Sequence, residues 1–175
     1  MRKPGALALV VPLALAGSAG CGTTDDKPGG VPSAGTSTSA EAADALERVS
    51  SDLYDLIGVK GKASDSRAGV TECSDKDPEK YFRVFHPWTF YPASAAELGR
   101  AMEQLKEELP KHGWKVVSYG PDTSRNKNMN LVADNDAKKA SVKVVEMAKN
   151  DPPKLSLTVV SGCYKTPNGT KVEEF

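Results

Sequence analysis

The side chains that most often carry chemistry are few in this chain, and they do not form a recognisable set. The only histidines are His86 and His112. A zinc site needs three or four ligands at regular spacings, and neither histidine has such companions. Asp134-Asn135-Asp136 begins like a calcium-binding EF-hand loop, but Lys139 and Val145 stand where that loop requires glycine and glutamate. We therefore expect a turn at this place, no bound metal and no cofactor.

Sequence signatures of catalysis and of nucleotide binding are also missing. The chain has no Gly-x-Ser-x-Gly nucleophile elbow, no phosphate-binding loop and no dinucleotide fingerprint. Lysine plus arginine equals aspartate plus glutamate, 23 of each, so the overall charge does not indicate a nucleic-acid partner. We expect a protein that is not an enzyme and does not bind nucleic acid.

The first twenty-one residues have the layout of an export signal. Arg2 and Lys3 precede an uncharged apolar run, Ala6 to Ala16, which is shorter than the roughly 20 residues of a membrane-spanning helix. Ser18-Ala19-Gly20-Cys21 resembles the bacterial lipobox, which implies cleavage before Cys21 and diacylation of its thiol, with palmitate among the expected chains. We expect a protein anchored through lipid at the extracytoplasmic face of the bacterial cell membrane. An ordinary export signal with a chance cysteine is the alternative.

Two cysteines remain once Cys21 is assigned to the lipid. Export would place Cys73 and Cys163 in an oxidising compartment, where an even number of thiols usually pairs. We predict a disulfide between them, and two buried free thiols are the alternative.

Composition divides the chain into four parts. Residues 1–20 are the expected signal peptide. Residues 21–39 are rich in glycine, serine, threonine and proline and are expected to be a flexible tether. Residues 40–164 have the length of one small domain, and residues 165–175 are a polar tail that we expect to fray.

Two helices are predicted from capping signals and apolar spacing. The first begins near Thr38, where Thr38-Ser39-Ala40-Glu41 fits a capping box, and it ends at Gly58. Its apolar stripe is Ala42, Leu46, Val49, Leu53, Leu56 and Ile57. The second begins with another capping box, Ser94-Ala95-Ala96-Glu97, and ends at Gly113. Residues 58–80 are expected to form a surface loop.

The fold class we predict is α+β, with a single antiparallel-rich sheet of about five strands and both helices packed on one of its faces. The five strands in chain order are Tyr81–Tyr91, Trp114–Tyr119, Met129–Ala133, Ala140–Met147 and Lys154–Tyr164. A right-handed helical crossover between the first two makes them parallel. The order 2-3-4-5-1 then brings the two cysteines to the same end of the sheet.

The first of these strands is the densest aromatic segment. Phe82, Val84, Trp88 and Phe90 share one parity and are expected to face inward, while Tyr81, Phe85 and Tyr91 would lie outward. Pro87 cannot donate to a neighbouring strand, which predicts an edge position or a bulge. Core packing accounts for most of this segment. Four of its residues are possible partner contacts: Phe85, His86, Trp88 and Tyr91.

The order of features from Glu41 to Tyr164 resembles that of small actinobacterial lipoproteins of the LppA-like type. They share a first helix, a loop cysteine, a strand, a capped helix running into Gly113-Trp114, and a closing segment from Leu157 to Tyr164. The resemblance implies a surface lipoprotein without enzymatic activity, and it transfers no functional residues.

The function we expect is that of a non-catalytic binding or interaction module of the cell envelope, with a membrane anchor and an envelope component as partner. The alternative is a carrier of a lipid or other apolar small molecule. A carrier would need an apolar cavity of about 300–1,000 Å³ between the first helix and the sheet.

Overall fold

The computed structural model describes residues 31–175, and these fold as a mixed sheet with two helices. The helices are α1 (Ser39–Leu56) and α2 (Leu98–Glu108), and α2 is flanked by the 3-10 turns Ala95–Glu97 and Leu109–His112. The strands are β1 (Ser33–Thr36), β2 (Gly61–Ala63), β3 (Gly69–Glu72), β4 (Tyr81–Pro92), β5 (Lys115–Pro121), β6 (Met129–Asn135), β7 (Ala140–Met147), β8 (Lys154–Ser161) and β9 (Cys163–Lys165). The α+β class is confirmed.

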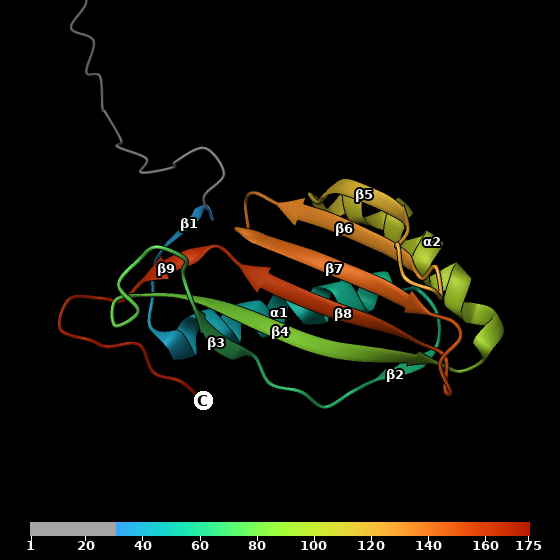
Figure 1. The fold of residues 1–175 in the computed structure, drawn as a ribbon, viewed down its shortest axis with the longest axis horizontal. Coiled ribbons are helices and arrows are strands. Elements are labelled where there is room, and N and C mark those ends of the chain that lie inside the picture. Colours follow the sequence, from blue (N-terminus) through green and yellow to red (C-terminus); the bar gives the residue numbers. More distant parts are fainter. Residues whose placement is uncertain (1–30) are drawn as a thin grey trace, which may run out of the picture.

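The nine strands form one sheet in the order β1-β9-β4-β8-β7-β6-β5, with β2 and β3 both paired to β4 (Figure 1). The five long strands lie in the expected order, since β5, β6, β7, β8 and β4 are neighbours in that sequence. The expected strand number is wrong, because four short strands extend the sheet. The sheet is also mixed, since β1 runs parallel to β9.

Three of the four additional strands lie in segments that carry no alternating apolar pattern. β2 and β3 fall within the predicted loop of residues 58–80, and β1 falls within the predicted tether, which therefore ends before residue 33. The predicted last strand is split at Gly162 into β8 and β9. A Cβ atom at Gly162 would stand 2.6 Å from the Pro32 carbonyl oxygen, so only glycine lets the chain before β1 approach this break.

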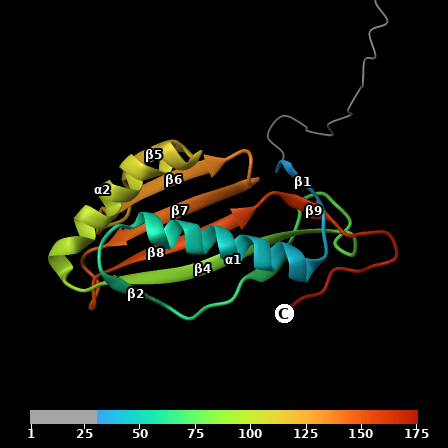
Figure 2. The same ribbon diagram turned by 180° about the vertical axis from the view of Figure 1, so that it is seen from behind.

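Both helices cover the same face of the sheet, as predicted (Figure 2). The capping box of α1 is confirmed: the Glu41 amide donates to the Thr38 hydroxyl at 3.3 Å, and the Thr38 amide donates to the Glu41 carboxylate at 3.3 Å. The second capping box is wrong, because Ser94 makes no capping hydrogen bond and a 3-10 turn leads into α2. The predicted end of the second helix at Gly113 is confirmed, since Gly113 caps the 3-10 turn after α2 with a left-handed φ of +80°.

The core lies between this face and the helices. In the strand register, Trp88, Leu157, Val144 and Leu131 follow one another across β4, β8, β7 and β6, and each is at most 5% exposed. The predicted inward set of β4 is confirmed, since Phe82, Val84 and Phe90 are fully buried.

The end of the sheet that holds β9 and the start of β4 is linked by a disulfide and by the C-terminal residues. Cys73 and Cys163 are bonded, with their Cα atoms 6.0 Å apart, as predicted. The tail does not fray as expected. The Thr166 amide donates to the Lys80 carbonyl at 2.9 Å, and the Glu173 amide donates to the Ser39 hydroxyl at 3.0 Å.

Candidate functional site

The site begins with an interruption in the strand pairing beside β4. Its partner on one side is β8, which pairs with it without a break from Phe85 to Phe90. On the other side β3 pairs with residues 82–85 and β2 pairs with residues 90–92, which leaves a gap opposite Pro87. Pro87 has the parity of Thr89, whose amide and carbonyl both bond to Ser64 on that side. The missing amide of Pro87 therefore faces the gap. The predicted edge position holds at this residue, where β4 is paired with β8 alone, although β2 and β3 cover the same side of β4 elsewhere.

The chain that connects β2 to β3 crosses this gap and approaches α1. We call residues 64–68 the connecting segment. Glu47 of α1 fixes it, since its Oε1 accepts from the Ala68 amide at 2.9 Å and from Arg67 Nε at 3.1 Å. The Ala68 amide, followed by the charge of Arg67, lowers the pKa of Glu47. An ionised Glu47 thus holds the segment against the helix.

A pocket of about 380 Å³ lies between α1, β4 and the connecting segment. Its volume is within the usual range of small-molecule sites. Its walls are mainly polar, with four serines, two acids and no lysine or arginine. The lining residues are Glu47, Ser50, Ser51, Tyr54, Asp55, Ala63, Ser64, Ser66, His86 and Trp88.

His86 joins the three walls of the pocket. Its Nε2 lies 3.0 Å from the Ser66 carbonyl oxygen, and its Nδ1 lies 2.8 Å from the Ser50 hydroxyl. Since a carbonyl only accepts, Nε2 carries a proton, and in the neutral ring Nδ1 accepts from Ser50. The order hydroxyl, imidazole and carbonyl is also the arrangement that activates a serine nucleophile. Here Ser50 is 4% exposed and belongs to the middle of α1.

Trp88 supplies a hydrogen-bond donor that nothing in residues 31–175 satisfies. Its Nε1 is buried without a partner, and it is the only buried side-chain nitrogen or oxygen of the described chain in that condition. A buried donor without an acceptor carries a desolvation penalty of about 1–3 kcal/mol. The indole packs beside Tyr54, whose ring centroid is 6.3 Å away. The pocket therefore has an aromatic wall formed by a residue whose indole nitrogen is buried and unpaired.

The four residues predicted as a joint partner contact lie on opposite faces of β4. His86 and Trp88 are 8% and 5% exposed and line the pocket on the helix side. Phe85 and Tyr91 are half-buried on the other face, where Phe85 packs over Gly69 and Lys154 lies over the Tyr91 ring. A partner that docked on one face of the sheet would contact two of these residues and not the other two. Contact with a partner stays a prediction for all four.

Ser50 and the inward orientation of His86 were missed in the sequence analysis, although both carried a readable signal. Ser50 stands four residues after Leu46 and three before Leu53, so it lies on the buried stripe of α1. His86 has the parity of the inward residues of β4. A polar residue on a buried face needs a partner, and here the two satisfy one another.

The remaining candidates lie elsewhere. Cys21 is outside the described residues. Asp134-Asn135-Asp136 forms a turn in which the Asn135 side chain accepts from the Lys138 amide at 2.9 Å. Residues 31–175 contain no group of three or more histidines, cysteines or acids arranged to hold a metal. Neither α1 nor α2 has the length and apolar character that crossing a bilayer requires.

Comparison with known proteins gives no relative. No family model, no curated protein sequence and no solved structure matches this chain.

Proposed function

We propose that this protein is a non-catalytic, lipid-anchored binding module on the extracytoplasmic face of the bacterial cell envelope, and that the pocket under α1 is its ligand site. The observation that carries the ligand site is the buried Trp88 Nε1 without an acceptor beside a cavity of about 380 Å³. A ligand oxygen that accepts from this indole would remove the penalty of the unsatisfied donor.

The lining selects the chemistry of the ligand. Asp55 belongs to none of the ion pairs of residues 31–175 and can accept hydrogen bonds or attract positive charge, whereas Glu47 is already paired with Arg67. The serine hydroxyls both donate and accept. The ligand we propose is small, uncharged or cationic, and carries hydroxyl or amine groups together with an oxygen acceptor.

This lining argues against the apolar carrier. The cavity lies where a carrier would need it, between the first helix and the sheet, and its volume is sufficient. A lipid tail in this cavity would remove water from the polar walls, including the Glu47 and Asp55 carboxylates, without offering any hydrogen bond in return, and this is unfavourable.

We also propose that the Ser50–His86 pair holds the pocket wall and performs no reaction. The Ser50 hydroxyl belongs to the middle of α1 and is almost fully covered. A serine nucleophile must reach a substrate carbonyl carbon. Labelling of Ser50 by a fluorophosphonate probe, absent in Ser50→Ala, would contradict the non-catalytic proposal.

The ligand site is tested by native mass spectrometry of the full-length protein purified from its own host. We expect one small polar molecule per chain. Trp88→Phe, which removes the indole donor and keeps an aromatic ring, should lose it. Trp114→Phe is the matched control, because Trp114 is the only other tryptophan, is buried and does not line the pocket.

Three results would contradict the proposed ligand site. A stoichiometric lipid would favour the carrier. Retention of the polar molecule by Trp88→Phe would remove the indole from the site. Recovery of bare protein would contradict a tightly held pocket ligand. A wild-type protein recovered free of acyl chains would overturn the anchor at Cys21, as would an acyl label that persists in Cys21→Ala.

A further inference from the structure

The face of the sheet opposite the helices is open. In Figure 1 this face is turned toward the viewer, and no helix of residues 31–175 covers it. The strand register assigns side chains to it without ambiguity. Phe85 is opposite Val160, Pro87 is opposite Thr158, and Thr89 is opposite Ser156, and these pairs continue into β7 and β6.

This face carries six basic residues and one acidic residue. The acid is Asp134, which is opposite Lys115. The basic residues come from six different strands, and they are Lys62, Arg83, Lys115, Lys143, Lys154 and Lys165. Lys62, Lys115, Lys143 and Lys165 are exposed, and the other two are half-buried.

None of these six cations belongs to an ion pair within the described chain. The seven ion pairs of residues 31–175 all use other cations, namely Arg67, Lys80, Arg100, Lys106, Lys111, Lys138 and Lys171. Arg83 donates to the Ser161 carbonyl at 3.1 Å, and Lys154 lies over the Tyr91 ring. The positive charge of the open face is therefore only partly compensated, by Asp134 and by Asp136, which line a pocket with Arg83.

The helix-covered side has the opposite charge. α1 contains five acids and one arginine, and α2 contains three acids and two bases. A chain with equal numbers of acidic and basic side chains is thus polarised across the thickness of the sheet. A dispersed positive face attracts an anionic surface, and the attraction acts within about one Debye length of contact.

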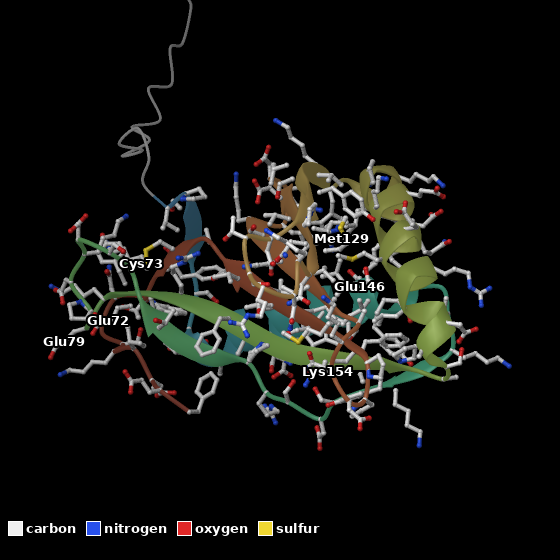
Figure 3. The ribbon with its side chains drawn as sticks, turned by 45° about the vertical axis from the view of Figure 1, so that its right-hand side comes forward. Glu72, Cys73, Glu79, Met129, Glu146 and Lys154 are labelled. Atoms are coloured by element: carbon white, nitrogen blue, oxygen red, sulfur yellow. A yellow bond between two sulfur atoms is a disulfide. The ribbon has the colours of Figure 1, made fainter. Side chains whose placement is uncertain are left out.

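We propose that the open sheet face docks on the anionic phospholipid headgroups of the membrane. The cations are spread over six strands, and only Arg83 lines a pocket, one of about 190 Å³ beside Asp134 and Asp136. This spread suits a plane of many headgroups better than a single polymer chain. Lys165 lies two residues after Cys163, which is bonded to Cys73. Figure 3 shows Lys154 well away from Cys73 along the sheet, so the cations are not confined to one end.

The position of the proposed anchor is consistent with this contact. The sheet begins at Ser33, twelve residues after Cys21. Twelve residues span at most about 40 Å when fully extended. The anchor would therefore keep the domain beside the bilayer, where weak attraction by several lysines is sufficient to orient it. The proposal is independent of the pocket ligand.

Vesicle co-sedimentation of the full chain carrying Cys21→Ala tests this contact without an acyl chain. The probes are vesicles of phosphatidylcholine with a minor share of phosphatidylglycerol, compared with pure phosphatidylcholine. We expect binding to the anionic vesicles that weakens as salt rises. Lys143→Gln with Lys154→Gln should weaken it about 30-fold, since each lysine near such a surface is worth about fivefold. All variants share the same N-terminal residues, so differences between them report the sheet.

The matched control is Lys106→Gln with Lys111→Gln, which removes two positive charges from the helix side. These two changes should leave vesicle binding within about twofold of the parent, because they lie away from the docked face. If circular dichroism shows that Lys154→Gln perturbs the sheet, the exposed Lys62→Gln takes its place.

Three outcomes would overturn the proposal. The first is equal binding to both kinds of vesicle. The second is an equal loss in the control pair, which would indicate attraction to overall charge. The third is tighter binding to soluble dextran sulfate than to the anionic vesicles, which would identify a polymer as the partner.

Discussion

The two faces of the sheet are built on the same strands and have opposite properties. The helix-covered face is packed, holds one polar pocket and is bordered by acidic helices. On the open face of β7 and β8, threonine, serine and valine alternate with lysines that form no ion pair within residues 31–175. In β4 the change occurs between neighbours, since Phe85 belongs to the open face and His86 to the pocket.

A neutral composition thus conceals two surfaces of opposite charge. Because successive side chains of a strand point to opposite faces, one sequence encodes two surfaces with independent charge. The overall charge gave no reason to expect a nucleic-acid partner, and it conceals the positive face because it averages over both faces of the sheet. The variants below change one face, the other, or the disulfide that both share.

The largest effect is expected from loss of the disulfide, which serves both faces. Cys73 lies between β3 and β4, and Cys163 begins β9, 90 residues later. The double variant Cys73→Ala and Cys163→Ala should lose about 2–5 kcal/mol of unfolding free energy. Urea unfolding measures this loss, and reduced wild-type protein is the control. An unchanged unfolding midpoint would contradict the prediction.

The next effect compares adjacent residues on opposite faces. His86→Leu leaves the Ser50 hydroxyl and the Ser66 carbonyl without partners, and should lower the unfolding free energy by about 2–3 kcal/mol. Phe85→Leu, at a half-buried residue of the open face, should lower the unfolding free energy by about 1 kcal/mol or less. Urea unfolding of both variants at pH 7 tests the difference. Equal losses would mean that the two faces are packed alike.

Part of this architecture could be predicted from residue patterns alone. The Thr38 capping box, the apolar stripe of α1 and the inward parity of β4 are local signals, and all three are present. The disulfide and the order of the five long strands followed from chain direction and cysteine position. These features depend on a few neighbouring residues or on simple connection rules.

The remainder depends on tertiary contacts that have no local signature. β1, β2 and β3 are short and polar, and they exist because β9 and β4 offer unpaired edges. The pocket requires the connecting segment to cross the gap at Pro87 and bond to Glu47. Pro87 shows in the sequence that one backbone donor is missing. Only the pairing of β4 with β8 on one side, and with β2 and β3 on the other, shows on which side of β4 the gap lies. His86 and Ser50 could have been identified from parity and helical spacing.

A smaller effect is expected at the tryptophan of the pocket. Trp88→Phe removes some buried apolar volume, which is unfavourable, and also removes an unsatisfied donor, which is favourable. The two should nearly cancel, so the unfolding free energy should change by about 1 kcal/mol or less. Urea unfolding of ligand-free protein checks this. A loss above about 3 kcal/mol would mean that the indole has a hydrogen-bond partner inside the fold.

The smallest effect concerns a carboxylate at the helix-covered edge. Glu146 lies close to α2 (Figure 3), and a Cβ atom at Gly99 would be 3.9 Å from its Oε1. Burial, followed by the charge of Glu103, raises the pKa of Glu146. Glu103 itself is held ionised: the Tyr119 hydroxyl donates to it at 2.6 Å, which lowers the pKa of Glu103, and burial and this carboxylate raise the pKa of Tyr119 to about 12.

The direction of the pH effect follows from this shift. A carboxyl whose pKa is higher in the folded state binds its proton more tightly there, so stability falls as pH rises through that pKa. Glu146→Gln removes the ionisation and should stabilise the protein at pH 7 by a few tenths of a kcal/mol, about 0.5 at most given its solvent exposure. The gain should vanish below about pH 4, where the wild-type carboxyl is protonated in both states. Urea unfolding at the two pH values measures it, with Glu103→Gln as the control of opposite sign. A gain of equal size at both pH values would show that the Glu146 charge is not its cause.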